Sequence, residues 1–230
     1  MQAQAIIPSA GLGKRMGGVK KPFILLRDKP ILAWTLDVFQ KCESIDNILI
    51  VTAEGDETRI INEIVNPYHF DKVCDIVIGG ETRQESVFNA LCKVRSDADI
   101  VVIHDAVRPF VTEDMILKSI EQADQFGSAI VAVPVKDTIK ESNNDGFVSK
   151  TLDRQLLWSI QTPQSFKYKL IMQAHRYARE NQIQATDDAS LIEQIGHKVK
   201  IIMGSYDNIK ITTVDDIVIA EAILKLKGMI

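Results

Sequence analysis

Near its start the chain reads Ala5-Ile6-Ile7-Pro8-Ser9-Ala10-Gly11-Leu12-Gly13-Lys14-Arg15-Met16-Gly17-Gly18. A short apolar run suited to a buried strand passes directly into a glycine-rich loop. Glycines let the backbone turn tightly, and the N–H groups of such a turn can approach an anion. The loop and its continuation also carry four cations, Lys14, Arg15, Lys20 and Lys21. This combination predicts a triphosphate site, with a simple connecting turn or a solvated basic surface as the alternatives.

Two familiar phosphate-binding loops are excluded by the residues present. A dinucleotide fingerprint requires a glycine where Met16 stands, and a P-loop requires Lys-Ser or Lys-Thr where Lys14-Arg15 stands. The first loop therefore matches neither of these two phosphate-binding motifs.

Downstream of this loop, strand-like and helix-like segments alternate. Apolar or β-branched runs occur at 5–7, 47–52, 75–78, 99–103 and 128–133, each followed by helical spacing. Helix starts are indicated by Thr82 with Glu85 three residues later, by Thr112, by Thr213, and by Pro30 as a first helical residue. Nearly continuous apolar strands suit a sheet covered on both faces. We therefore predict an α/β fold with a Rossmann-like, doubly wound, mostly parallel sheet, and substrates beyond the carboxyl ends of its strands.

One region interrupts the alternation. Between residues 135 and 158, the turn sequence Ser142-Asn143-Asn144-Asp145-Gly146 separates two short strand-like pieces. This pattern predicts a protruding β-arm on a single domain of residues 1–230. Such an arm suits dimerisation, and a solvent-exposed hairpin is the alternative.

Composition narrows the class of protein. In 230 residues, 46% are hydrophobic and 25% charged, which is typical of a globular domain. A net charge of −4 speaks against nucleic acid as a partner. The chain has no run of about twenty apolar residues and no signal-peptide pattern, so we expect no membrane partner and a cytoplasmic location. Cys42, Cys74 and Cys92 are expected to be free thiols.

Four motifs follow one another at suitable separations: the glycine loop, His104-Asp105-Ala106-Val107-Arg108-Pro109, Thr162-Pro163-Gln164 and Asp207-Asn208-Ile209-Lys210. Through them the whole chain resembles the 2-C-methyl-D-erythritol 4-phosphate cytidylyltransferases of the non-mevalonate isoprenoid pathway. The resemblance implies a nucleotidyltransferase fold, a homodimer, a Mg²⁺ cofactor, and transfer of the cytidylyl group of CTP to a sugar-alcohol phosphate with release of pyrophosphate.

The resemblance also assigns site residues. Arg15, Lys21 and Lys210 resemble the catalytic cations of the family. The nucleotide-binding set it implies comprises Ser9, Ala10, Gly11, Gly13, Gly80, Glu81, Ser86 and Asp105, with Asp105 also the metal residue. The acceptor-binding set comprises Arg108, Thr138, Arg154 and Thr186, of which Thr138 and Arg154 would come from the arm of the opposite subunit.

Three points stay open at the level of sequence. The family usually has proline before the loop lysine, whereas this chain reads Lys20-Lys21-Pro22-Phe23, so Lys20 is the fallback for Lys21. His104 is interpreted as structural, because a phosphate nucleophile is already an anion near neutral pH and needs no general base. Asp187 and Asp188 are interpreted as helix-capping residues, with metal binding as the alternative.

Three rival functions remain. One is a sugar-nucleotide transferase that uses UTP or GTP, since the choice of base rests only on the match at 80–86. Ribitol 5-phosphate cytidylyltransferases share the glycine loop and the Asp-Ala-x-Arg-Pro signature, and only the residues that contact the acceptor would separate the two. A non-catalytic nucleotide-binding module is the third candidate. The charged set Arg15, Lys21, Asp105 and Lys210, which comes from three distant segments, speaks against it, because binding alone does not require convergence of these residues on one phosphate.

Overall fold

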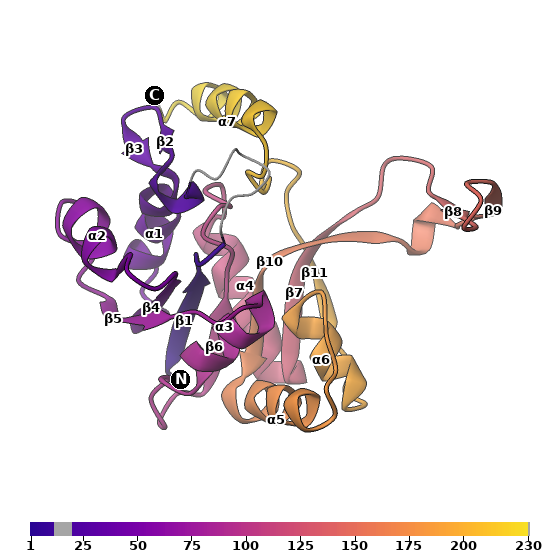
Figure 1. Cartoon of the computed structure of the whole chain (residues 1–230), viewed down its shortest axis with the longest axis horizontal. Helices are drawn as coiled ribbons and strands as arrows, with labels where there is room; N and C mark the ends of the chain where they lie inside the picture. The colour runs from indigo at the N-terminus through magenta and orange to yellow at the C-terminus, as the bar shows by residue number, and fades with distance from the viewer. Residues whose placement is uncertain (12–19, 230) are drawn as a thin grey trace.

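A seven-stranded sheet forms the centre of the protein in the computed structural model, which describes residues 1–11 and 20–229 (Figure 1). The strand order is β11-β7-β10-β6-β1-β4-β5. These strands are β1 (Ala3–Pro8), β4 (Asn47–Thr52), β5 (Val73–Ile78), β6 (Ile100–Ile103), β7 (Ser128–Pro134), β10 (Trp158–Lys167) and β11 (Lys200–Met203). Neighbouring strands are parallel except at β10, which runs antiparallel to both β6 and β7. The predicted α/β fold with a mostly parallel sheet is confirmed.

Helices cover both faces of this sheet. The helices that pack around it are α1 (Ile31–Lys41), α2 (Glu57–Ile60), the π-helical η3 (Ile61–Val65), α3 (Arg83–Leu91), α4 (Glu113–Phe126), α5 (Tyr168–Glu180) and α6 (Asp188–Gln194). A further helix, α7 (Val214–Leu226), lies apart from the sheet faces (Figure 1). Successive strand side chains point to opposite faces. Accordingly, Ile7 belongs to one buried cluster with Leu36 of α1, whereas its neighbour Ile6 belongs to another with Val87 of α3. This double burial explains why the strands read as nearly continuous apolar runs.

Local capping signals fix several helix starts. Thr82 accepts a hydrogen bond from the Glu85 N–H, and the Glu85 carboxylate accepts one from Thr82 N–H in return. As predicted, Thr213 caps α7 through the same kind of capping box, with Asp216, and Thr112 caps α4 by accepting from the Met115 N–H. The prediction for Pro30 was wrong by one residue. Lys29–Pro30 forms a short strand, β3, against β2 (Leu25–Leu26), so α1 begins only at Ile31.

Strands β10 and β11 were not predicted from the sequence. Strand β10 was missed because of its polar composition. It includes four buried polar residues, Gln161, Thr162, Gln164 and Ser165. These side chains find partners inside the protein; the Gln164 amide, for example, donates to Asp187 at 2.8 Å. A strand whose polar groups are satisfied by tertiary contacts carries little hydrophobic periodicity.

The segment between β7 and β10 extends away from the body as an arm (Figure 1). It contains β8 (Lys140–Ser142), β9 (Val148–Thr151) and the 3₁₀ turn η4 (Arg154–Leu156). Between the strands, the Asn143 carboxamide oxygen accepts from Phe147 N–H at 2.9 Å, and Gly146 has a φ of 83°. The turn residues singled out in the sequence therefore lie at the tip of the hairpin.

The 3₁₀ turn η2 (Lys21–Phe23) leads into β2, and α7 packs over Leu26 and Ile31. Within the part of the chain that the structure describes, no helix combines the length and the apolar character needed to cross a membrane.

Candidate active site

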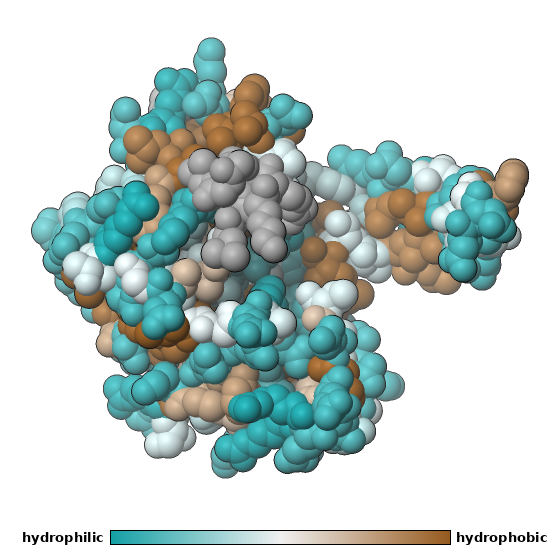
Figure 2. Space-filling model, viewed as in Figure 1, coloured by the Kyte–Doolittle hydropathy of each residue, from teal (hydrophilic) through white to brown (hydrophobic). Residues whose placement is uncertain are grey.

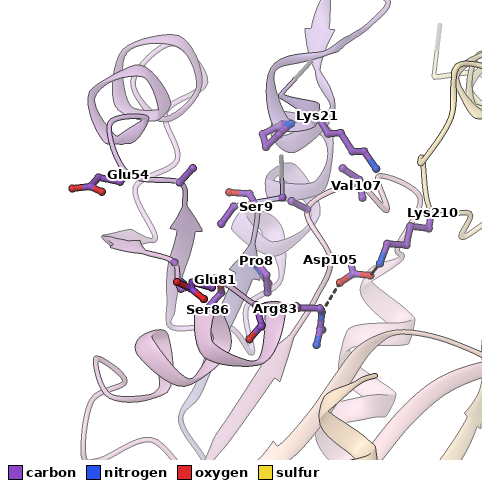
Figure 3. A pocket seen from close by; sticks show the side chains of 18 residues that line it. Pro8, Ser9, Lys21, Glu54, Glu81, Arg83, Ser86, Asp105, Val107 and Lys210 are labelled. Atoms are coloured by element: carbon purple, nitrogen blue, oxygen red, sulfur yellow. Dashed lines mark hydrogen bonds and ion pairs between the residues drawn. The ribbon is translucent and has the colours of Figure 1, made fainter. Parts of the chain in front are cut away.

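A cavity of about 760 Å³ lies beyond the carboxyl ends of β1, β4, β5 and β6, where a parallel sheet is expected to bind its ligand (Figure 3). Segments far apart in sequence form its walls. Its lining is Pro8, Ser9, Ala10, Gly11, Lys21, Pro22, Ala53, Glu54, Gly79, Gly80, Glu81, Thr82, Arg83, Ser86, Asp105, Ala106, Val107 and Lys210. The sequence-predicted residues from the first strand, from 80–86, from the Asp105 motif and from the Lys210 motif are thus brought together.

The first wall is the end of β1. Ser9 is buried and its hydroxyl donates to the Val51 carbonyl at 2.6 Å, so this side chain holds the loop to β4. Ala10 and Gly11 then face the cavity. Gly13 and Arg15, two further predicted residues, lie outside the described part of the chain.

The two candidate lysines differ in their surroundings. Lys21 lines the cavity, whereas the Lys20 ammonium lies 2.5 Å from the Asp56 carboxylate. Figure 3 shows Lys21 and Lys210 approaching the same region of the cavity from different segments.

The second wall is the turn between β5 and α3. Gly79 allows a close approach, since a Cβ at this position would lie 2.8 Å from both the Ala10 Cβ and the Ser86 Oγ. The buried Ser86 hydroxyl accepts from the Gly80 N–H at 3.1 Å. Glu81 is exposed at the rim, and the capping box on Thr82 fixes the start of α3. The backbone of this turn is therefore held close to the end of β1.

Asp105 is the centre of a charge cluster on the third wall. Its carboxylate lies 2.7 Å from Lys210 Nζ, 3.4 Å from Arg83 Nε and 3.7 Å from Arg108 Nε. Its own N–H donates to the Thr162 hydroxyl at 3.0 Å. Burial by itself raises the pKa of the Asp105 carboxyl, but Arg83, Lys210 and Arg108 outweigh burial and hold this pKa well below its usual range. Asp105 is therefore ionised at neutral pH.

His104 is fully buried behind this wall. Its ring nitrogens lie 3.0 Å from the Thr162 hydroxyl and 3.1 Å from the Arg108 carbonyl. Burial lowers the pKa of His104 to about 4, so the ring is neutral at neutral pH. These contacts agree with the structural interpretation of His104.

A second cavity, of about 420 Å³, adjoins the first and shares Arg83, Asp105 and Lys210 with it. Arg108 and Thr186 line this second cavity, together with Thr162 and residues of α6. Arg108 Nη1 donates to the Asn208 carbonyl at 2.8 Å, whereas its buried Nε has no hydrogen-bond partner among the described residues. The two cavities thus share a charged boundary.

The arm residues lie elsewhere. Thr138 and Arg154 are exposed and line neither cavity of their own chain. The Arg154 guanidinium donates to the Lys136 carbonyl at 3.1 Å.

A metal ion would find few protein ligands here. In residues 1–11 and 20–229, no three His, Cys, Asp or Glu side chains gather as a ligand set. The Asp105 carboxylate faces the cavity, and Glu54 and Glu81 lie on its lining. Because Mg²⁺ commonly takes one or two carboxylates and fills its shell with water and substrate phosphates, this donor set fits an ion that arrives with a triphosphate.

Sequence reasoning missed Arg83. The interpretation of Asp187 and Asp188 as residues of a helix N-terminus is confirmed: the Asp187 carboxylate caps α6 by accepting from the Ser190 N–H at 3.1 Å, and Asp188 is in the first turn of that helix. Asp188 also makes a tertiary contact that the sequence did not indicate, because it is buried and lies 2.7 Å from Arg83 Nη1. One signal in the sequence could have indicated that Arg83 belongs to the site. This arginine is the first residue of the helix that follows the Gly79-Gly80 turn, and that turn lines the cavity.

Comparisons with known proteins agree with this geometry. A family model described as 2-C-methyl-D-erythritol 4-phosphate cytidylyltransferase matches residues 3–226. Proteins of that name from Clostridium acetobutylicum and Desulforamulus reducens are 50% and 47% identical, over 96% and 97% of this chain respectively and 96% of each relative.

Two solved structures have the same fold. The 4-diphosphocytidyl-2C-methyl-D-erythritol synthase of Anaerococcus prevotii is similar with a TM-score of 0.86, at 35% identity over 97% of this chain and 96% of that one. The 2-C-methyl-D-erythritol 4-phosphate cytidylyltransferase of Francisella tularensis gives a TM-score of 0.82, at 32% identity over 96% of this chain and 99% of that one.

Proposed function

Because the chain belongs to the family of 2-C-methyl-D-erythritol 4-phosphate cytidylyltransferases, and is an enzyme that joins CTP to this acceptor, we propose that the reaction occurs across the two adjoining cavities. CTP occupies the larger cavity and the acceptor the smaller one. The observation that carries this proposal is the shared boundary, where Lys210, Asp105 and Arg83 belong to both cavities. The names of the relatives from Clostridium acetobutylicum and Desulforamulus reducens favour 2-C-methyl-D-erythritol 4-phosphate over the rival acceptor, ribitol 5-phosphate.

The chemistry is substitution at phosphorus. A phosphate oxygen of 2-C-methyl-D-erythritol 4-phosphate forms a bond to the α-phosphorus of CTP, and the bond from this phosphorus to the oxygen bridging to the β-phosphate breaks. Pyrophosphate leaves with that electron pair, and 4-diphosphocytidyl-2-C-methyl-D-erythritol remains. The attacking phosphate is ionised near neutral pH, so no base must remove a proton. The protein's task is to align two anions and stabilise the charge that develops between them.

Lys21 and Lys210 supply fixed positive charge for this task, together with Arg15, which lies outside the described residues. Lys21 comes from the segment after the first loop and Lys210 from the segment before α7, and both line the larger cavity. Two cations approaching from opposite ends of the chain suit a transferring phosphoryl group, on which charge accumulates at several oxygens at once.

The nucleotide would contact the end of β1 and the turn before α3. Ser9, Ala10 and Gly11, followed by Gly13 beyond the described part, would face the phosphates and ribose. Gly80, Glu81 and Ser86 would face the cytosine base, because they belong to the neighbouring wall of the larger cavity, formed by the turn before α3.

Mg²⁺ would be held by Asp105 and by the triphosphate. When bound, it neutralises phosphate charge and polarises the reacting phosphorus. The protein's own contribution is to keep the Asp105 carboxylate ionised and oriented, which its pairs with Lys210 and Arg83 support.

The acceptor would bind in the smaller cavity, against Arg108 and Thr186. The Arg108 guanidinium brings a positive charge to the lining of this cavity, which supports an anionic occupant. Thr138 and Arg154 would reach this cavity from the arm of a second subunit, since neither lines a cavity of its own chain.

A homodimer of single-domain subunits, each spanning residues 1–230 with the arm at 135–158, follows from this arrangement. Apolar side chains on the arm support it: Phe147, Val148 and Leu156 are 72%, 61% and 78% exposed in a single chain (Figure 2). A cytoplasmic location is proposed as well, because all three cysteines are free thiols, as a reducing compartment favours.

Pyrophosphate release by the purified protein tests the assignment. CTP, UTP, ATP and GTP are each combined with 2-C-methyl-D-erythritol 4-phosphate or ribitol 5-phosphate, with and without Mg²⁺. Release with CTP and the methylerythritol phosphate alone is expected. A preference for ribitol phosphate would move the enzyme to the rival acceptor, and no release with any pair would contradict the function altogether.

A further inference from the structure

We infer that Arg83, held in place by the buried Asp188, is a positioning residue that keeps Lys210 available to the substrates by sharing the charge of Asp105. This inference rests on the proposed function, because it assigns a role within the same site. Arg83 lines both cavities, and its side chain is 31% exposed.

The position of Arg83 is fixed from two sides. It is the first residue of α3, directly after the capping box on Thr82, so its backbone is held by the helix start. Its guanidinium then divides its hydrogen bonds, with Nη1 at 2.7 Å from Asp188 Oδ2 and Nε at 3.4 Å from Asp105 Oδ1.

Asp188 has little freedom to release this guanidinium. Its side chain is 1% exposed, and its other oxygen, Oδ1, lies 3.2 Å from His175 Nε2. His175 is also 1% exposed and stacks against the Phe88 ring, with centroids 6.1 Å apart. A carboxylate buried in this way depends on its cation, because an unpaired buried charge is strongly disfavoured. Asp188 therefore acts as an anchor for Arg83 inside the protein.

A continuous series of contacts consequently runs from the interior to the reaction site. It passes from His175 in α5 to Asp188 in α6, to Arg83 in α3, to Asp105 after β6, and to Lys210 before α7. These five side chains come from five different segments of the chain. The two carboxylates Asp105 and Asp188 meet three cations, Arg83, Arg108 and Lys210, which leaves one net positive charge at the boundary between the cavities.

This balance matters for Lys210. An Asp105 carboxylate without Arg83 would attract Lys210 more strongly, and the boundary would carry no net charge beside two anionic substrates. With Arg83 present, Asp105 divides its attraction, and Lys210 can turn from Asp105 toward a phosphate as charge develops there. The role is one of positioning, because Arg83 acts through Asp105 and Lys210.

A purely structural role makes different predictions. If Arg83 served only to neutralise Asp188, its loss would lower the stability of the fold and leave turnover per folded enzyme unchanged. Removing the charge of Asp188 at the same time would then restore the stability.

The test measures kcat and KM for CTP and acceptor, alongside thermal unfolding, in Arg83→Gln, Arg83→Lys, Asp188→Asn and the double variant Arg83→Gln/Asp188→Asn. Arg83→Gln should lower kcat about 10- to 100-fold with a smaller change in KM for CTP, because misplacement of a reacting group costs about this much. Arg83→Lys should recover part of the loss. The double variant should resemble Arg83→Gln alone, since residues acting through one another are not additive.

Asp37→Asn is the matched control. It removes another partly buried ion pair, with Lys29, on α1 away from both cavities, and kcat should stay at the wild-type value. If Asp188→Asn does not fold, the two Arg83 variants still decide, because Arg83 is partly exposed. A folded Arg83→Gln enzyme with wild-type kcat overturns the inference while the proposed function stands. A wild-type protein that releases no pyrophosphate overturns both.

Discussion

The charge cluster at Asp105 and the β8–β9 arm both extend from the ends of strands in the same sheet, yet their surroundings are opposite. Asp105 is 7% exposed, and its partners Arg83, Arg108 and Lys210 all come from its own chain. The residues of β8 and β9 are all exposed, and the arm leaves the body of the molecule (Figure 1). The first region is completed by intramolecular contacts. The second presents apolar and cationic side chains whose use depends on another molecule.

The largest effect should come from removing a cation of the completed region. Lys210→Ala and Lys21→Ala should each lower kcat about 100- to 1,000-fold, as is typical for the loss of a donor that stabilises developing charge. Lys20→Ala is the matched control, because Lys20 pairs with Asp56, and its kcat should stay within a few-fold of wild type. A severe loss in Lys20→Ala with a mild one in Lys21→Ala would reverse the assignment of the two lysines.

A substitution in the arm should have the next largest effect. It should change KM for the acceptor rather than KM for CTP. Arg154→Ala should raise KM for the acceptor about 10- to 100-fold, because a hydrogen bond to a charged group contributes roughly 1.5–3 kcal/mol. KM for CTP should change little, and steady-state kinetics at varied acceptor concentration measure the difference.

Mixing variants sharpens this test of the arm. Arg154→Ala and Lys210→Ala chains, unfolded and refolded together, should regain roughly a quarter of wild-type activity at low acceptor concentration. Half of the dimers are then mixed, and one of the two sites in each mixed dimer has an intact arm and an intact lysine. No recovery would mean that Arg154 serves its own chain, and the contrast between the two regions would fail.

The free energy of unfolding should depend on pH because His104 is buried behind the site. The exposed arm offers no comparable buried histidine. The pKa of His104 is about 4 in the folded protein and about 6.5 when unfolded. The unfolded chain therefore binds the extra proton first, so stability is fully present above pH 6.5 and declines as pH falls toward 4, by roughly 3 kcal/mol. Urea unfolding between pH 7 and 4 should show this slope, and His104→Asn should flatten it. Equal slopes in both proteins would contradict the account.

The smallest expected effect comes from removing a helix cap. Two caps can be compared, Thr82 at the site and Thr213 away from it. Thr82→Ala and Thr213→Ala each remove the side chain of a capping box and should each lower the free energy of unfolding by about 1 kcal/mol. Only Thr82 lines the larger cavity, so only Thr82→Ala should also raise KM for CTP. Equal KM values in the two variants would show that the turn before α3 does not contact the nucleotide.

Sequence was most informative where the signal is local. The strand at 47–52 and the helix starts at Thr82, Thr112 and Thr213 depend on periodicity and on hydrogen bonds between residues three apart, and they were predicted. Strand β10 was missed because its buried polar side chains are satisfied by partners distant in sequence, such as Asp187 for Gln164.

The residues of the candidate site also fall into two groups, those that the sequence indicated and one that it did not. Motif resemblance named Asp105, Lys210 and the 80–86 turn, and the fold brings them to one cavity. It did not name Arg83, whose importance comes from Asp188, a partner 105 positions away.

Sequence alone thus determined the class of fold, the capped helices and the family to which the chain belongs, because hydrophobic period, capping and motif order are properties of neighbouring residues. Tertiary structure decided which lysine of the Lys20-Lys21 pair faces the cavity, that His104 is buried and neutral, and that Asp188 holds Arg83. Each of these depends on the burial of a charged or titratable group and on the partner it meets there. Both are set only when distant segments pack together.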